Sequence, residues 1–461
     1  MTDQIFTLTT RIARPAAEVF AWHERPGALA RLCPPWERIE LISSSGGIRD
    51  GARVVIRSRV GPVWSEWQVE HRDYVEGRQF RDVLRKGPFV KWEHLHAIEP
   101  DGPAACFLTD TITYRLPLGA VGQAVAGGMV RRKLAQTFRW RQDVTKADLE
   151  FTASHGAGPK MKILVAGASG LLGRALVPFL QTQGHSVVRL VRRATTAVDE
   201  VTWNPATGEG DAARLEGVDA VINLSGENVA AGRWTTARRE RIFRSRVDAT
   251  RTLVTLLARL SRKPAVMVNA SAVGFYGDRG EEELTEASAA GDGFLAEAVQ
   301  AWEAEAGKVS AQGIREVRLR LGVVLSPAGG ALAKLLPLFR AGLGGRMGSG
   351  RQWMSWISVD DAVGALYHAV VSPQMSGAVN GTATDPVTNA GFTAMLAGVL
   401  RRPAVLPVPA AVLRGVFGQM ADETILASAK VIPGKLTATG YGFRWPHLDG
   451  ALRHVLGRNF S

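Results

Sequence analysis

Residues 161–193, MKILVAGASGLLGRALVPFLQTQGHSVVRLVRR, decide the fold of most of this chain. The apolar run KILVA leads into a glycine-rich turn, which is followed by apolar residues at helical spacing. A second β-forming run, SVVRLVRR, comes after that helix. The order of strand, tight turn, helix and strand predicts the start of a doubly wound parallel sheet, which is an α/β fold.

Glycines recur in this turn with the spacing GxxGxxG. The first permits the tight turn, the second lets the backbone approach a pyrophosphate, and the third lets the helix pack on the strand. The helix N-terminus adds free amide donors and a dipole that favour phosphate. We therefore predict that a dinucleotide is held by Gly167, Ala168, Ser169, Gly170, Leu171, Leu172 and Gly173.

The end of the second strand bears on which dinucleotide binds. NAD-selective domains place a carboxylate there, about 20 residues beyond the glycines, whereas an arginine accommodates the 2′-phosphate of NADP. Here Arg192 and Arg193 end the strand, and no carboxylate follows before Asp199. Because the planar guanidinium suits phosphate, we predict NADP(H) as the cofactor. The alternative is that both arginines only solvate a loop.

Ligands of a parallel sheet bind at the carboxyl ends of its strands. The predicted strand VDAVINLSGE ends there with the cofactor-wall candidates Leu224, Ser225 and Gly226. The further strand PAVMVNASAVGFYGD brings the catalytic candidates Ser271 and Tyr276 to the same edge.

Residues 1–150 alternate apolar with polar side chains, which predicts a half-buried antiparallel sheet. The expected strands are IFTLTTRI, ARVVIRSRV, WSEWQVEHRDYV, FVKWEHLHAIE and ACFLTDTITYRL. A helix is expected within PAAEVFAWHERPGALARL, and a long amphipathic helix from about Gly119 to Glu150. The polar and glycine-containing residues 151–161 predict a linker to the second domain.

This order of elements, together with the entry ARPAAEVFAWHERPGALARLCPPW, resembles the START-like ligand-binding superfamily, also called SRPBCC or polyketide cyclase-like. The resemblance implies an α+β helix-grip domain over residues 1–150, whose long helix closes a cavity for an apolar small molecule against a curved sheet. Four tryptophans either line that cavity or fill a core: Trp64, Trp67, Trp92 and Trp140.

The segments GASGLLG, NLSGENVAAGRW, SRVDAT, SAVGFYGD and GRQWMSWISVDD occur in an order that resembles the epimerase-like atypical branch of the extended short-chain dehydrogenases/reductases. The resemblance implies an NADP-binding Rossmann domain over residues 162–400 and a small C-terminal domain over 401–461. It also implies that Val191 and Arg192 lie at the adenosine end, that Leu224 and Ser225 line the site, and that Arg246 reaches the cofactor.

The candidate catalytic residues depart from the pattern of this superfamily. Extended members of this superfamily use a Tyr with a Lys four residues later, and here Leu295 and Val299 occupy those positions. Ser271 is either a remnant of the catalytic serine or a strand-end hydroxyl bonded to backbone, and an alternative register to Tyr276-Gly277 places Ala272 at the serine position instead. Tyr276 is either a donor to substrate or a structural aromatic in a turn. Substrate-side candidates, in a segment whose glycines otherwise only accommodate a long connection, are Arg351, Gln352, Trp353 and Trp356.

Charge, cysteine content and hydropathy limit the classes of partner that we expect. The net charge of +13 is dispersed, with no run of more than three basic residues, so we expect no nucleic-acid partner. Only two cysteines occur, and no His, Cys or carboxylate cluster has ligand spacing, so we expect a reducing cytoplasm and no metal. No apolar run approaches about 18 residues, so no membrane partner is expected.

Two functions remain open. The first is an NADP(H)-dependent oxidoreductase or epimerase-like enzyme that acts on a small molecule with an unusual proton donor. The alternative is a non-catalytic sensor or carrier that binds NADP(H) and a small ligand.

Overall fold

The computed structural model describes residues 3–60, 63–156 and 158–458. The chain divides into two compact units. The first, here the N-terminal unit, comprises the described residues of 1–158, 178–184 and 456–461. The second, here the Rossmann unit, comprises residues 159–177 and 185–455, so residues 401–455 group with it rather than forming a unit of their own.

The N-terminal unit contains one antiparallel sheet of seven strands in the order β1-β7-β6-β5-β4-β3-β2. The strands are β1 (Gln4–Ile12), β2 (Ile39–Ser45), β3 (Arg53–Val60), β4 (Val63–Val75), β5 (Gln79–Lys86), β6 (Lys91–Pro100) and β7 (Cys106–Arg115). Burial alternates along β1 and β7, as expected for a sheet with one covered face. The sequence pattern predicts five of these strands but not β2 or β5.

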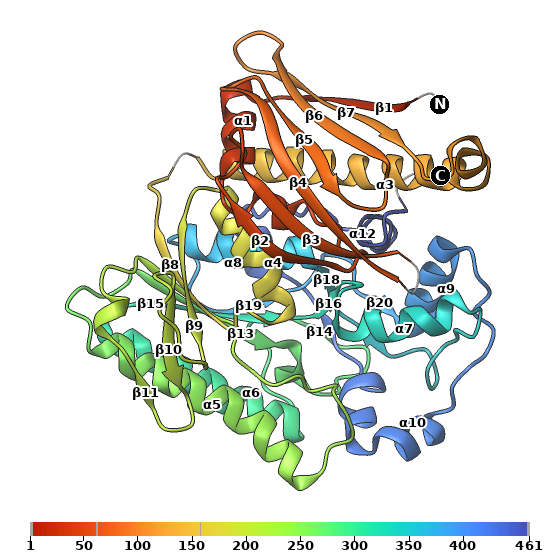
Figure 1. Ribbon diagram of the computed structural model, residues 1–461. Helices are drawn as coiled ribbons and strands as arrows, with labels where there is room; N and C mark the ends of the chain where they lie inside the picture. The colour runs from red at the N-terminus through yellow and green to blue at the C-terminus, as the bar shows by residue number, and fades with distance from the viewer. Residues whose placement is uncertain (1–2, 61–62, 157, 459–461) are drawn as a thin grey trace. The chain divides into compact units, whose positions relative to one another are not determined.

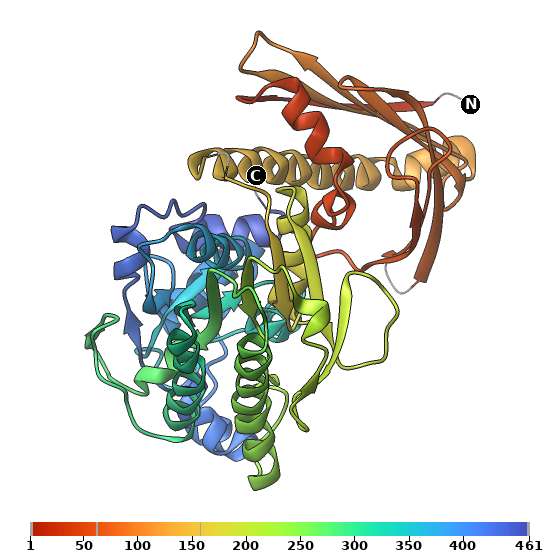
Figure 2. The same ribbon diagram turned by 90° about the vertical axis from the view of Figure 1, so that its left-hand side faces the viewer.

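The helices of this unit are α1 (Ala16–Glu24), α2 (Ala28–Arg31) and α3 (Gly119–Ser154). Figures 1 and 2 show α1 and α3 on the same side of the sheet. Phe20 and Trp22 of α1 and Leu149 of α3 share one hydrophobic core with Phe80 and Ile98 of the sheet. A long helix laid across a curved antiparallel sheet is the predicted helix-grip fold.

The Rossmann unit is built on a sheet in the order β11-β10-β9-β8-β12-β13-β15-β19, parallel except for the β10–β11 pair. Its strands are β8 (Lys162–Ala166), β9 (Ser186–Val191), β10 (Glu200–Asn204), β11 (Glu209–Gly210), β12 (Ala220–Asn223), β13 (Val266–Ala272), β15 (Arg315–Leu321) and β19 (Gly377–Gly381). The chain order reverses direction at β8, so β8 and β12 flank the switch point where doubly wound sheets bind ligands.

Helices cover both faces of this sheet. Figure 1 shows α5 and α6 side by side below the sheet and α8 on the opposite side. The longer helices are α4 (Leu171–Thr182), α5 (Thr236–Ala258), α6 (Phe294–Gly307), α7 (Gly330–Arg340), α8 (Val359–Val371), α9 (Asn389–Leu400), α10 (Ala410–Phe417) and α12 (Leu448–Val455), with the short α11 (Gly434–Ala438).

Three two-stranded sheets join distant segments: β14 (Glu283–Leu284) with β21 (Lys430–Val431), β16 (Val323–Leu325) with β18 (Trp356–Ser358), and β17 (Trp353–Met354) with β20 (Val387–Thr388). The first of these ties the small C-terminal region to the loop after β13. No helix within the described residues has the length and apolar character needed to cross a membrane.

Candidate functional site

The turn between β8 and α4 is closed on its inner side and open at its tip. Gly167 has a φ of +78°, and a Cβ there would lie 2.6 Å from the Leu224 carbonyl oxygen. A Cβ at Gly173 would lie 2.5 Å from Ala168 Cα. At Gly170, which is exposed, a Cβ would meet only the Gly167 oxygen, at 3.2 Å. The fold itself therefore requires Gly167 and Gly173, whereas Gly170 leaves space beside the backbone that suits a phosphate.

The other predicted cradle residues surround this tip. Ser169 is exposed, and its carbonyl accepts a hydrogen bond from Arg174 at 3.0 Å. Ala168, Leu171 and Leu172 are half-buried. The first turn of α4 thus begins at the open tip, where its free amides face outward from the helix end.

The end of β12 supplies a buried polar atom that has no hydrogen-bond partner among the described residues. Asn223 Nδ2 donates to Asn269 Oδ1 at 2.7 Å and to Thr250 Oγ1 at 3.0 Å, and Asn223 Oδ1 accepts from Ser225 N at 3.1 Å. The Ser225 Oγ is buried and has no hydrogen-bond partner within the described chain. A buried hydroxyl is costly unless it is bonded, so a ligand with hydroxyl or phosphate groups fits here. No sequence motif singled out Thr250 or Asn269, because their contact with Asn223 joins residues that are far apart in the chain.

Arg246 of α5 lies against Gly226 of the same edge. A Cβ on Gly226 would be 3.2 Å from the guanidinium carbon. That guanidinium donates to the carbonyls of Ile242 and Glu227, each at 3.0 Å, and lies 5.2 Å from the centroid of the Trp302 ring. Burial lowers the pKa of Arg246 to about 10, which still leaves the side chain cationic at neutral pH. A fixed positive charge therefore stands beside the β12 edge.

The two arginines at the end of β9 differ in their contacts. Arg193 donates to both Glu200 oxygens, at 2.7 and 2.8 Å. The Thr195 hydroxyl first, and then Arg189 and Arg193, lower the pKa of Glu200. Arg192 is exposed, and its side chain has no hydrogen bond or ion pair with any described residue. Arg192 is thus the guanidinium that remains available, next to the half-buried Val191.

The two catalytic candidates belong to one buried network. Ser271 Oγ donates to Glu303 Oε1 at 2.6 Å, and Arg320 donates to both Glu303 oxygens at 2.8 Å. Arg320 also donates to Tyr276 Oη at 3.0 Å, which in turn donates to Asn380 Oδ1 at 2.7 Å. Tyr276 is fully buried, and burial raises the pKa of its phenol. Both hydroxyls are therefore engaged inside the protein.

The positions expected for a Tyr and a Lys lie on α6. Val299 is buried, and Leu295 is half-buried with its backbone N–H donating to Glu423 Oε2 at 2.8 Å. Neither side chain carries a group that transfers a proton, so α6 supplies packing at these positions.

The substrate-side candidates do not share one environment. Trp356 is fully buried and donates to the Asp385 carbonyl at 2.8 Å. Gln352 is buried and donates to two backbone carbonyls. Trp353 is half-buried, with its indole N–H donating to Glu281 Oε2 at 2.6 Å. The Arg351 side chain is exposed. Among these four, only Arg351 and Trp353 keep surface that a ligand could contact.

The four tryptophans of the N-terminal unit that we expected at a cavity or in a core also lie in different environments. Trp140 is buried, whereas Trp67 and Trp92 are half-buried and meet edge to face at 5.4 Å. Trp64 is exposed, with Arg57 5.2 Å from its ring centroid.

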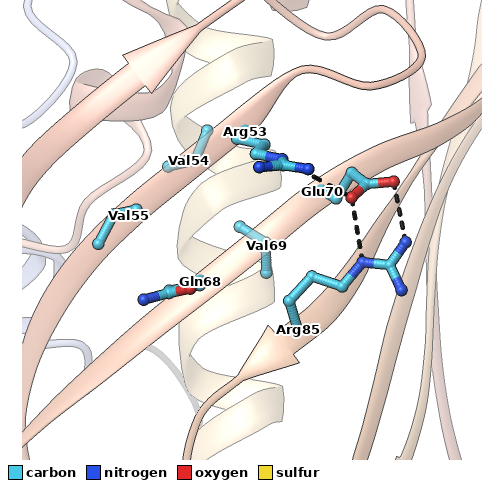
Figure 3. Close-up of a pocket in the computed structure, with 7 residues that line it drawn as sticks. All are labelled: Arg53, Val54, Val55, Gln68, Val69, Glu70 and Arg85. Carbon is cyan, nitrogen blue, oxygen red and sulfur yellow. Dashed lines mark hydrogen bonds and ion pairs between the residues drawn. The ribbon is translucent and has the colours of Figure 1, made fainter.

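A hollow on the sheet of this unit is shown in Figure 3. Glu70 at its rim accepts hydrogen bonds from Arg85 at 2.9 and 3.1 Å and lies 3.8 Å from Arg53. The Arg85 guanidinium lowers the pKa of Glu70 to about 2, so this carboxylate stays ionised at neutral pH. Its lining comes from β3, β4 and β5: Arg53, Val54, Val55, Gln68, Val69, Glu70 and Arg85.

The structure also assembles a group that sequence spacing did not reveal. Asp82, His94 and His96 offer ligand atoms within 4.8 Å of one another. The spacing His94-x-His96 on β6 is a local signal, but Asp82 comes from the neighbouring strand β5 and no local pattern relates it to them.

Three family models match the chain in order. Residues 3–149 match the polyketide cyclase / dehydrase and lipid transport family. Residues 163–380 match the NAD dependent epimerase/dehydratase family, and residues 408–455 match a domain of unknown function, DUF1731.

Similar proteins cover either the second part or nearly all of the chain. An epimerase family protein of Mycobacterium bovis is 43% identical over 296 residues, which are 64% of this chain and 98% of that protein. The crystal structure of human epimerase family protein SDR39U1 (isoform 2) with NADPH is 34% identical, with a TM-score of 0.59, over 65% of this chain and all of that one. The crystal structure of a nucleoside-diphosphate sugar epimerase from Corynebacterium glutamicum is 32% identical, with a TM-score of 0.82, over 98% of this chain and 90% of that one.

These matches confirm both resemblances that the sequence suggested. The relatives are matched over nearly their full length, and the family models follow the same order as the elements. The chain therefore belongs to the epimerase family of extended short-chain dehydrogenase/reductase proteins and carries a polyketide cyclase-like domain at its N-terminal end.

Proposed function

We propose that the Rossmann unit binds NADP(H) at the carboxyl edge of β8, β9 and β12. The observation that carries this proposal is Arg192, an exposed guanidinium at the end of β9 without a partner among the described residues. The open tip at Gly170 and the unpartnered hydroxyl of Ser225 support it, because they suit the pyrophosphate and a ribose or phosphate oxygen. The human relative named above was crystallised with NADPH.

Titration of the full-length protein with NADPH and with NADH tests the proposal. One charged hydrogen bond to the 2′-phosphate contributes about 1.5–3 kcal/mol to binding. The Kd for NADPH is therefore expected to be at least about tenfold lower than the Kd for NADH. Comparable dissociation constants for the two cofactors would overturn the assignment to NADP(H).

For the reaction, we propose an oxidoreductase or epimerase-like activity on a small molecule. A bound nicotinamide cofactor supplies hydride transfer. Arg351 and Trp353 are proposed to contact the substrate, because they alone among the four substrate-side candidates keep surface that a ligand could contact. The proton donor does not come from a Tyr and Lys pair, since Leu295 and Val299 stand at those positions.

A second candidate is a sensor or carrier that binds NADP(H) and a ligand without turnover. The engagement of Ser271 with Glu303 and of Tyr276 with Asn380 favours it, because neither hydroxyl is free to serve a substrate. Mass spectrometry of small molecules that co-purify with the protein, followed by an NADPH oxidation assay with each, separates the candidates. Oxidation above the cofactor-only rate supports the enzyme, and tight binding without oxidation supports the carrier.

For the N-terminal unit we propose binding of an apolar small molecule, supported by its family match and by the half-buried Trp67 and Trp92.

For the whole protein we propose a reducing, cytoplasmic setting, which the free thiols of Cys33 and Cys106 support. We propose that its partners are small molecules, and neither nucleic acid nor a membrane. Cell fractionation tests the compartment, and native mass spectrometry tests whether a small molecule is bound.

A further inference from the structure

A polar cluster lies on the covered face of the N-terminal sheet. Its members are His71 of β4, Asp82 of β5, His94 and His96 of β6, and Asp110 of β7. The strand register places His71 opposite Asp82, Asp82 opposite His94, and His96 opposite Asp110. Because directly opposed residues share a face of a sheet, all five side chains project to the same side. The three imidazoles and Asp110 are buried.

Asp110 orients the two imidazoles of β6. His94 Nε2 is hydrogen-bonded to Asp110 Oδ1 at 2.9 Å, and His96 Nδ1 lies 2.9 Å from the same oxygen. The second Asp110 oxygen accepts from Gln142 Nε2 of α3 at 2.6 Å. The remaining ring nitrogens then both face Asp82 Oδ2, which lies 3.5 Å from His94 Nδ1 and 3.7 Å from His96 Nε2.

Aromatic packing restrains these rings. Phe80 stacks on His96 with a centroid distance of 4.2 Å, and Phe138 meets His94 edge to face at 4.8 Å. Side chains locked by packing and hydrogen bonds are what a preorganised ligand set requires.

The distances from the Asp82 oxygen to the two inward-facing nitrogens match those in a metal site, and the three atoms all lie within 4.8 Å of one another. Bonds of about 2.0–2.2 Å from zinc to nitrogen or oxygen give ligand-to-ligand edges of about 3.3–3.6 Å in a tetrahedron. The distances of 3.5 and 3.7 Å from Asp82 to the two imidazoles are close to this value. In protein metal sites the far nitrogen of a ligating histidine commonly bonds to a carboxylate, and Asp110 stands in that place.

We propose that Asp82, His94 and His96 bind one divalent transition-metal ion, with Asp110 as the carboxylate that orients the imidazoles. Two imidazoles and one carboxylate suit ions such as Zn²⁺ or Fe²⁺ and leave coordination positions for water or a substrate. The carboxylates of Asp82 and Asp110 balance the charge of such an ion. His71, whose Nε2 lies 3.0 Å from Asp82 Oδ1 and whose Nδ1 is buried without a hydrogen-bond partner within the described chain, stands beside this ligand set.

Asp82 is the most exposed of the three proposed ligands. The Asp82 side chain is 23% exposed, whereas those of His94 and His96 are 3% and 9% exposed. We therefore expect an arriving cation to contact this carboxylate before the two imidazoles.

The test uses the full-length protein after dialysis against a chelator. Titration with Co²⁺ is expected to give a saturable visible absorption band at one equivalent per chain, and Zn²⁺ is expected to displace it. The alternative is a metal-free network in which protonated imidazoles balance the carboxylates. In that case no saturable band forms, and this result alone overturns the proposal.

Variants locate the ion. His94→Gln and Asp82→Asn are expected to abolish the band, and Asp110→Asn to weaken Co²⁺ affinity by about 10–100-fold. His447→Gln, at a histidine whose side chain is 78% exposed, is the matched control and should leave the titration unchanged. Circular dichroism checks that each variant folds. An unchanged band in folded His94→Gln, or an anomalous diffraction peak from Zn²⁺-soaked crystals only at another place, would refute the site.

Discussion

The Ser271 hydroxyl donates a 2.6 Å hydrogen bond to the carboxylate of Glu303, which joins the end of β13 to α6. The same carboxylate holds Arg320 through two 2.8 Å hydrogen bonds, and the side chains of Glu303 and Arg320 are only 3% and 5% exposed. A residue at a candidate catalytic position is thus tied into a buried ion pair.

Removal of this carboxylate should cost far more stability than removal of an exposed one. Glu303→Ala leaves the Arg320 charge buried and unpaired, so the free energy of unfolding is expected to fall by about 3–5 kcal/mol. Glu240→Ala, which removes an exposed partner of Arg244 on α5, should change it by less than about 1 kcal/mol. Urea denaturation measures both, and equal losses would mean that the buried pair is not what stabilises this region.

The glycines of the β8–α4 turn should separate binding from folding. Gly170→Ala is expected to keep the thermal unfolding temperature within a few degrees and to weaken NADPH binding by at least about tenfold, because the methyl group would occupy the space beside the phosphate. Gly173→Ala should instead lower stability by about 1–3 kcal/mol, because its Cβ would lie 2.5 Å from Ala168 Cα. Calorimetric titration and thermal melts of both variants check this, and NADPH affinity that survives in Gly170→Ala would remove that residue from the site.

The adjacent arginines at the end of β9 should differ in their effect on the cofactor. Arg192→Gln is expected to raise the Kd for NADPH by about 10–100-fold and to leave that for NADH nearly unchanged, through loss of a charged hydrogen bond to the 2′-phosphate. Arg193→Gln is the matched control, because its guanidinium is already engaged by Glu200. Equal effects of the two variants on NADPH would contradict the assignment of the phosphate contact to Arg192.

Alkaline pH should unfold the Rossmann unit cooperatively. Burial raises the pKa of Tyr276, Tyr367 and Tyr441 above their ordinary value of 10. A phenol whose pKa is higher in the folded state contributes full stability below about pH 10, and this contribution is lost as the pH rises through the folded pKa. Phenolate absorbance and circular dichroism should therefore change together above about pH 10. Ionisation of these phenols well below the unfolding transition would show that they are not held neutral by the fold.

The fold of both units could be predicted because their signals are local. Apolar residues that repeat with a period of two or of 3.6 report which face of a strand or helix is covered, and glycine spacing reports a tight turn. The prediction from residues 161–193 is confirmed by β8, α4 and β9. The strands β2 and β5 escaped because most positions of β2 are exposed and β5 has intermediate burial on both faces, so neither shows a clean alternation.

What the sequence alone determined is therefore the type and order of the elements and the edge of the sheet at which a dinucleotide would bind. Only the tertiary structure decided which groups at that edge are engaged. Glu200 reaches Arg193 rather than Arg192 from the neighbouring strand, and Glu303 reaches Ser271 from a helix 32 positions further along the chain.

The histidine cluster shows the same difference between what the sequence determines and what only the tertiary structure decides. His94 and His96 stand at covered positions of β6, a signal that sequence alternation contained, but their partners Asp82 and Asp110 come from other strands. Periodicity is a property of neighbours along the chain, whereas the pairing of charges depends on strand register and burial, which bring together residues that no local pattern relates.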